Sequence, residues 1–184
     1  MNEREAMVAR AEFLSEQYDA HGKFMLESDA QGCTRACIIE KGYAFKAVHK
    51  AKESDQNRSE WDFYTMTTDE IRALLAKPLY ISKNGRVLVM EALTPWRSTR
   101  YTLEDLEKHE CALNDATTKA HGGLIIGDFH GGNWGVRKNS KRVLLLDYAS
   151  MSWHATDHEW RRPENIHQPH PEYDRSLMLQ LLSS

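Results

Sequence analysis

The 184-residue sequence predicts an α+β fold in which an antiparallel sheet fills the first half of the chain and helices dominate the second. Short runs rich in β-branched and aromatic residues flank a glycine-containing turn at 41–42, and two more flank Asn84-Gly85, a dipeptide typical of tight hairpins. Helical periodicity appears between these hairpins at 58–66 and again over 103–120. At this length the chain forms one domain or two small lobes.

The first half contains a helix followed by sheet elements. The apolar residues Met7, Ala11, Leu14 and Tyr18 form one stripe and predict a helix that docks on the rest of the fold, although a loose amino-terminal extension fits the same pattern. The other expected elements are strands over 23–27, 33–40 and 43–49, a helix over 58–66, a capped helix over 67–76, and strands over 79–82 and 86–93.

The second half begins with a break near Pro95. Thr102 and Asp105 resemble a capping box that opens a helix over 103–120. Its expected buried residues are Leu106, Leu113, Ala116 and Ala120. A hairpin with strands over 134–137 and 142–146 should follow, and Pro171 should open a last helix.

Composition narrows the function classes. A formal net charge of −3 gives no electrostatic case for binding nucleic acid or an anionic membrane. The sequence has no apolar stretch of membrane-spanning length, and its first residues lack the apolar segment of a signal peptide. The cysteine count of 3 is odd, which favours reduced thiols. We therefore expect a cytoplasmic protein that contacts neither nucleic acid nor membrane.

The hairpin near the end of the chain predicts a metal site. A turn centred on Ser140 would place Asn133 directly opposite Asp147, with their Cβ atoms about 5 Å apart on one face. An amide and a carboxylate there could share one hard cation. Asp128 precedes them on a glycine-flanked loop and could act on a hydroxyl group beside that cation. An ordinary hairpin with Asp and Asn as turn formers explains the same residues.

Residues 128–133 (DFHGGN) and 145–149 (LLDYA) resemble the catalytic core of protein-kinase-like phosphotransferases. His130 makes the loop similar to those of aminoglycoside-phosphotransferase-type kinases and of small bacteriophage serine/threonine kinases. The resemblance implies that Asp128 is the catalytic carboxylate, that Asn133 and Asp147 hold Mg²⁺, and that ATP is the phosphate donor.

The same resemblance extends into the first half. Ala44-Phe45-Lys46 is similar to the strand whose lysine holds the ATP phosphates, and it implies that Glu60 on the next helix orients that lysine. A solvated edge lysine and a surface glutamate are the alternative interpretations. Glu91 and Leu93 fall where the family seats adenine, and Gly32 lies in the loop that would cover the phosphates.

The resemblance implies a protein-kinase-like fold. Residues 1–93 would form an amino-terminal helix and an antiparallel-sheet small lobe, and 94–184 a truncated, mainly helical large lobe. The expected function is an ATP- and Mg²⁺-dependent phosphotransferase, a minimal serine/threonine protein kinase with a protein substrate, acting in a host cytoplasm if phage-encoded. The alternative is a catalytically weak, kinase-like protein that binds or inhibits a larger partner.

A metallophosphatase is a third interpretation, because residues 127–131 (GDFHG) resemble the G-D-x-H-G motif of those enzymes. That family also requires G-D-x-V-D-R-G and G-N-H segments, and neither occurs in this sequence. The kinase-like interpretation therefore explains more of the chain.

Overall fold

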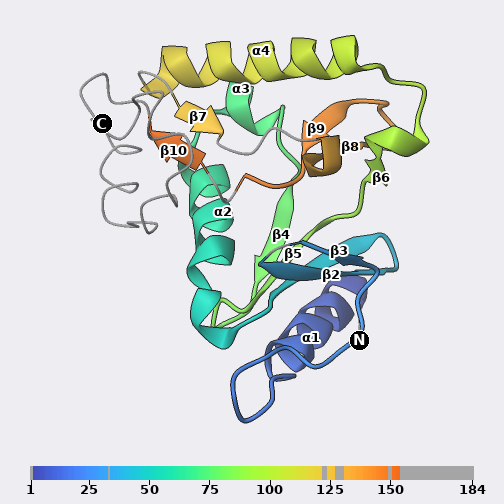
Figure 1. Cartoon of the computed structure of the whole chain (residues 1–184), viewed down its shortest axis with the longest axis vertical. Coiled ribbons are helices and arrows are strands. Elements are labelled where there is room, and N and C mark those ends of the chain that lie inside the picture. The colour runs from blue at the N-terminus through green and yellow to red at the C-terminus, as the bar shows by residue number, and fades with distance from the viewer. Residues whose placement is uncertain (1, 33, 122–123, 127–130, 149–150, 154–184) are drawn as a thin grey trace.

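The computed structural model describes residues 2–32, 34–121, 124–126, 131–148 and 151–153 (Figure 1). Its centre is a five-stranded antiparallel sheet with the strand order β1-β2-β3-β5-β4. The strands are β1 (Ala30–Gln31), β2 (Arg35–Glu40), β3 (Tyr43–Val48), β4 (Pro78–Ile81) and β5 (Val87–Glu91). The α+β class and the two hairpins predicted from the sequence are confirmed, and Gly42 and Gly85 adopt positive φ angles of 83° and 75° in their turns.

The strand expected over 23–27 does not form. Only isolated bridges pair Lys23 with Lys50 and Phe24 with Tyr18, and the sheet edge is the two-residue strand β1. The reason is that consecutive amides bond to different segments: Phe24 donates to the His49 carbonyl, whereas Met25 donates to that of Gln17. This segment therefore cannot build a continuous ladder with one neighbour.

Helix α1 (Glu3–Ser15) covers one face of the sheet (Figure 1). Asn2 and Glu5 form a capping box at its start, each side chain accepting the other's backbone N–H, at 2.9 and 2.8 Å. The buried stripe of Met7, Ala11 and Leu14 packs in a core cluster with residues of β2, β3 and β5. The docking interpretation is confirmed, although the helix ends before Tyr18.

Helix α2 (Asp55–Met66) packs on the opposite face of the sheet, whereas α3 (Asp69–Arg72) and α4 (Leu103–His121) lie farther from it and pack against each other (Figure 1). The three helices contribute to a second core cluster together with residues of β5. Strand alternation directs Phe45 towards α1 and Leu88 and Met90 towards this second core. Helix α2 begins three residues earlier than expected. Helix α3 covers only part of the capped helix expected over 67–76, and its capping residue is Thr68.

Helix α4 begins and ends close to the predicted bounds. Thr102 and Asp105 form the expected capping box, with the Thr102 N–H donating to Asp105 at 2.8 Å and the Asp105 N–H to Thr102 at 3.3 Å. Leu106, Leu113 and Ala116 are buried as predicted, but Ala120 is exposed. Within the described residues, no helix has the length and apolar character needed to cross a membrane.

Short strands complete the second half. A three-stranded sheet joins β6 (Thr94–Pro95), β8 (Trp134–Val136) and β9 (Val143–Leu145), and β7 (Leu124–Ile126) pairs with β10 (Met151–Trp153). In the described part of the chain, other elements are connected by the 3-10 helices η1 (Ala51–Glu53), η2 (Trp96–Ser98) and η3 (Gly131–Asn133). The helix expected from Pro171 lies outside the described residues.

The β8–β9 hairpin forms where the sequence predicts it, but its register differs by one residue. Trp134 pairs with Leu145, so Asn133 lies opposite Leu146, whose N–H donates to the Asn133 carbonyl at 2.6 Å. The predicted pairing of Asn133 with Asp147 is therefore wrong. The loop over 138–141 has an even number of residues, which puts its centre between two residues rather than on Ser140.

Gly135 should not tolerate a side chain. A Cβ atom there would lie 2.7 Å from the Leu93 Cβ and 3.0 Å from the Leu146 Cδ1. We expect Gly135→Ala to lower the free energy of unfolding, measured in urea, by about 1–3 kcal/mol, because the packed backbone must shift. Gly32→Ala is the matched control, since its Cβ would meet only the Arg35 carbonyl, at 3.5 Å. Equal effects of the two changes would contradict this packing.

Candidate functional site

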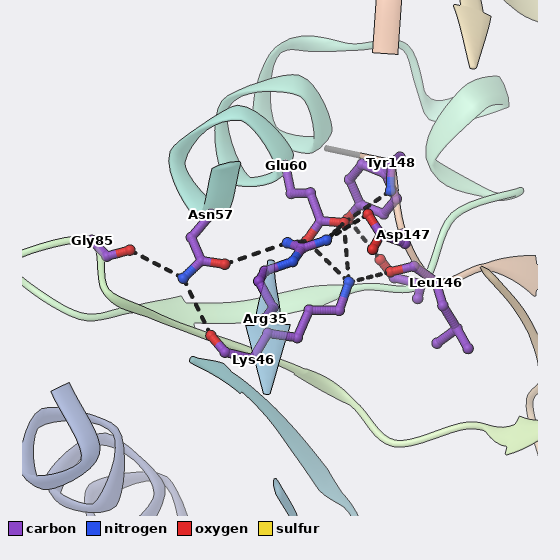
Figure 2. A network of polar contacts seen from close by, with 9 residues as sticks. Arg35, Lys46, Asn57, Glu60, Gly85, Leu146, Asp147 and Tyr148 are labelled. Carbon is purple, nitrogen blue, oxygen red and sulfur yellow. Dashed lines mark hydrogen bonds and ion pairs between the residues drawn. The ribbon is translucent and has the colours of Figure 1, made fainter. Parts of the chain in front are cut away.

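A buried ion pair joins the sheet to helix α2. The Lys46 Nζ lies 3.0 and 3.1 Å from the two carboxylate oxygens of Glu60, and it also donates to the Leu146 carbonyl at 2.5 Å (Figure 2). The Lys46 side chain is only 10% exposed and that of Glu60 is fully buried. The structure therefore brings the two predicted residues together, next to the segment that contains Asp147. Neither is the solvated surface residue of the alternative interpretation.

Asn57 fixes the geometry of this pair. It lies one helical turn before Glu60 on α2, and it is buried. Its side-chain amide donates to the backbone carbonyl of Lys46 at 3.2 Å and to that of Gly85 at 3.1 Å. Helix α2 is thereby tied to the backbone of β3 at the very residue whose side chain reaches Glu60. The sequence interpretation missed Asn57, although its spacing of three from Glu60 predicts a shared helix face.

Arg35 is the second residue that sequence reasoning missed. Its guanidinium is bridged between two carboxylates: the Nη1 atom lies 2.8 Å from Glu60 and the Nη2 atom 2.5 Å from Asp147 (Figure 2). The alternation of strand residues could have found it, because Cys37 pairs with Lys46 and Arg35 shares the face of Cys37. Burial disfavours the charged form of Arg35, but Asp147 and Glu60 outweigh burial and raise its pKa. The guanidinium is therefore a permanent cation.

Glu60 gathers donors from three separate segments. In addition to Arg35 and Lys46, the backbone N–H of Tyr148 donates to it at 2.8 Å. Tyr148 is fully buried, and its hydroxyl donates to the Ala76 carbonyl at 2.9 Å. Burial raises the pKa of this phenol well above its usual value, so Tyr148 stays neutral. One carboxylate thus aligns β2, β3 and the segment after β9.

We call Arg35, Lys46, Glu60 and Asp147 the charge cluster. It holds two positive and two negative side chains. Asp147 is the most accessible member, with 35% of its side chain exposed, whereas Arg35 is 6% exposed. The exposed edge of the charge cluster is therefore an anionic group backed by two cations.

The two proposed metal ligands, Asn133 and Asp147, come from different places in the fold. Asn133 is buried at the end of η3, and Asp147 follows Leu146 beyond β9. Their amide and carboxylate oxygens suit Mg²⁺ in chemical type, and an ionised carboxylate offers about four lone-pair sites, enough to serve Arg35 and a cation together. The described residues contain no cluster of three or more His, Cys, Asp or Glu side chains able to hold a metal ion. Asp128 lies outside the described residues.

The loop predicted to cover the phosphates is held to the sheet. The Gly32 N–H donates to the Arg35 carbonyl at 2.8 Å, and the Gly32 carbonyl lies 2.9 Å from the His49 Nε2. The carboxylate of Asp29, in the same loop, accepts the Ile39 N–H at 2.6 Å. These bonds give the loop a fixed path, and nucleotide binding by Gly32 stays a prediction.

The segment expected to seat adenine connects the five-stranded sheet to the three-stranded sheet. The Glu91 carboxylate pairs with Arg137 through two contacts of 2.8 and 2.5 Å and accepts the Lys77 N–H at 2.8 Å. Leu93 packs on Gly135 of the β8–β9 hairpin. The Glu91 side chain thus has a structural role, and adenine contacts at Glu91 and Leu93 stay a prediction.

No protein-family model matches the chain, and no curated protein matches it. Among solved structures the chain is similar to the crystal structure of Cex1p, with a TM-score of 0.45 and 11% sequence identity. The similarity covers 71% of this chain and 26% of the Cex1p chain, so this chain spans about a quarter of that protein. A likeness of this extent carries no argument about activity or partners.

Proposed function

We propose that this protein is an ATP- and Mg²⁺-dependent phosphotransferase, a minimal serine/threonine protein kinase with a kinase-like fold. The observation that carries the proposal is the buried Lys46–Glu60 pair at 3.0 Å, together with the contact of Lys46 with Leu146, the residue before Asp147. Protein kinases use a strand lysine held by a helix glutamate beside a metal-binding aspartate.

Each residue has a distinct task in this proposal. Lys46, oriented by Glu60, neutralises charge on the ATP phosphates, and Asp147 and Asn133 would hold Mg²⁺. The metal, when bound, supplies further neutralisation of the phosphate oxygens. Asp128 orients the acceptor hydroxyl and takes its proton as the oxygen bonds to the γ-phosphorus. The bond between that phosphorus and the β–γ bridging oxygen breaks, and ADP leaves.

Transfer of radiolabelled γ-phosphate tests the proposal, by autophosphorylation or with cell-extract proteins as acceptors. We expect Asp128→Ala to reduce transfer by about 10²–10⁴-fold while nucleotide binding persists, because the carboxylate acts on the acceptor. Asp147→Ala should instead weaken the metal–nucleotide complex. Asp69→Ala, at a side chain 96% exposed on α3, is the matched control. Undiminished transfer by both site variants would refute the assigned roles.

A kinase-like binding or inhibitor protein is the second candidate. It is favoured by the phosphate-covering loop, whose glycine N–H already donates to Arg35. Thermal unfolding with Mg-ATP separates the two candidates, because a ligand that binds only the folded state raises the melting temperature. An unchanged melting temperature together with a stable complex in pull-down experiments would favour the binding protein.

A further inference from the structure

The charge cluster is electrically balanced without any ligand. Arg35 and Lys46 contribute two positive charges, and Glu60 and Asp147 two negative ones. All except Asp147 are at least nine-tenths buried as side chains. In such surroundings charges interact strongly and salt screens them little. An added divalent cation would therefore leave the cluster with an uncompensated charge of two.

Within the charge cluster, Arg35 is the cation that neutralises the Asp147 carboxylate. Its Nη2 atom lies 2.5 Å from the Asp147 Oδ1, while Nη1 is held 2.8 Å from Glu60. Lys46 cannot take over this role in the observed arrangement, because its ammonium donates to Glu60 and to the Leu146 carbonyl. A cation that approaches Asp147 therefore meets a fixed guanidinium on the same carboxylate.

We propose that Arg35 makes divalent-cation binding at Asp147 dependent on a bound nucleoside triphosphate. This inference rests on the proposed function, because it takes Asp147 as a metal ligand. The triphosphate carries negative charge that offsets the charge of the added cation, so cation and nucleotide enter together. Arg35 is in this sense a positioning and selectivity residue, since it acts through Asp147 and excludes the free ion.

Removing the guanidinium of Arg35 changes the net charge of the cluster from zero to negative. With Arg35→Gln the cluster carries a net charge of minus one, and a divalent cation becomes favourable by itself. Mn²⁺ is the probe, because its electron paramagnetic resonance signal reports the free ion directly. We expect the full-length variant to bind Mn²⁺ without nucleotide at least about tenfold more tightly than the unmodified protein, since one full charge next to the carboxylate is removed.

Three further proteins complete the experiment. Arg10→Gln is the control, because Arg10 is also paired with a carboxylate, that of Glu40, but on the sheet face that α1 covers. This variant should leave Mn²⁺ binding unchanged. Adding Asp147→Asn to Arg35→Gln should abolish the gained binding. Arg35→Lys keeps the charge and should retain the nucleotide requirement, and it tests the proposal if the glutamine variant does not fold.

Two results would overturn the proposal. One is equal Mn²⁺ affinity of Arg35→Gln and the unmodified protein, and the other is tight Mn²⁺ binding by the unmodified protein alone. A non-hydrolysable ATP analogue then locates the failure. If the unmodified protein binds Mn²⁺ with the analogue, the proposed function survives and only the role of Arg35 falls. If no variant binds Mn²⁺ even with the analogue, both fall.

Discussion

Replacing Glu60 with glutamine is expected to lower the free energy of unfolding by about 3–5 kcal/mol, the usual cost of leaving buried charges without their partner. Glu60 is fully buried and accepts from Arg35, Lys46 and the Tyr148 N–H. Glutamine keeps the shape but loses the charge, so two cations remain with only Asp147 to balance them. Urea denaturation monitored by circular dichroism measures the change.

A second carboxylate provides the control for this prediction. Glu40→Gln removes the partner of Arg10, a pair with a contact of 2.5 Å whose side chains are 34% and 37% exposed. Exposed pairs of this kind contribute about 0–1 kcal/mol. We therefore expect a clear difference between the two variants. If both cost the same, Glu60 does not organise the fold as described, and the alignment of three segments on one carboxylate has another cause.

Local sequence signals predicted most of the elements. Capping residues such as Thr102, the Asn84-Gly85 turn and the apolar stripe of α1 each act over a few residues, and each of these elements formed, although α1 ends before Tyr18. These features depend on backbone preferences and periodicity, which a single sequence carries.

Features that depend on distant partners were harder to predict. Phe24 bonds to His49 and Met25 to Gln17, so the strand expected over 23–27 is divided between two neighbours. The hairpin register depended on the position of one turn centre, and an error of one residue moved Asp147 from opposite Asn133. Arg35 reaches Asp147 across more than one hundred residues of sequence, a contact that no local pattern encodes.

Replacing Lys46 with methionine should reduce phosphoryl transfer strongly while lowering the stability of the fold only moderately. We expect transfer to fall by about 10²–10³-fold, the range for loss of one electrostatic stabiliser in an active site. Stability should fall less than in Glu60→Gln, because Glu60 keeps its contacts with Arg35 and the Tyr148 N–H. Radiolabelled phosphate transfer and urea denaturation of the same preparation measure the two quantities.

Lys50→Met is the matched control, since Lys50 lies just beyond β3, is 55% exposed and pairs with Glu53 at 3.6 Å. It should change neither transfer nor stability appreciably. If Lys46→Met transfers phosphate as well as the control, or loses as much stability as Glu60→Gln, then Lys46 serves only as the counter-ion of Glu60. In that case the geometry shared with kinases would be a structural pair without a phosphate to bind, and the binding-protein candidate would gain support.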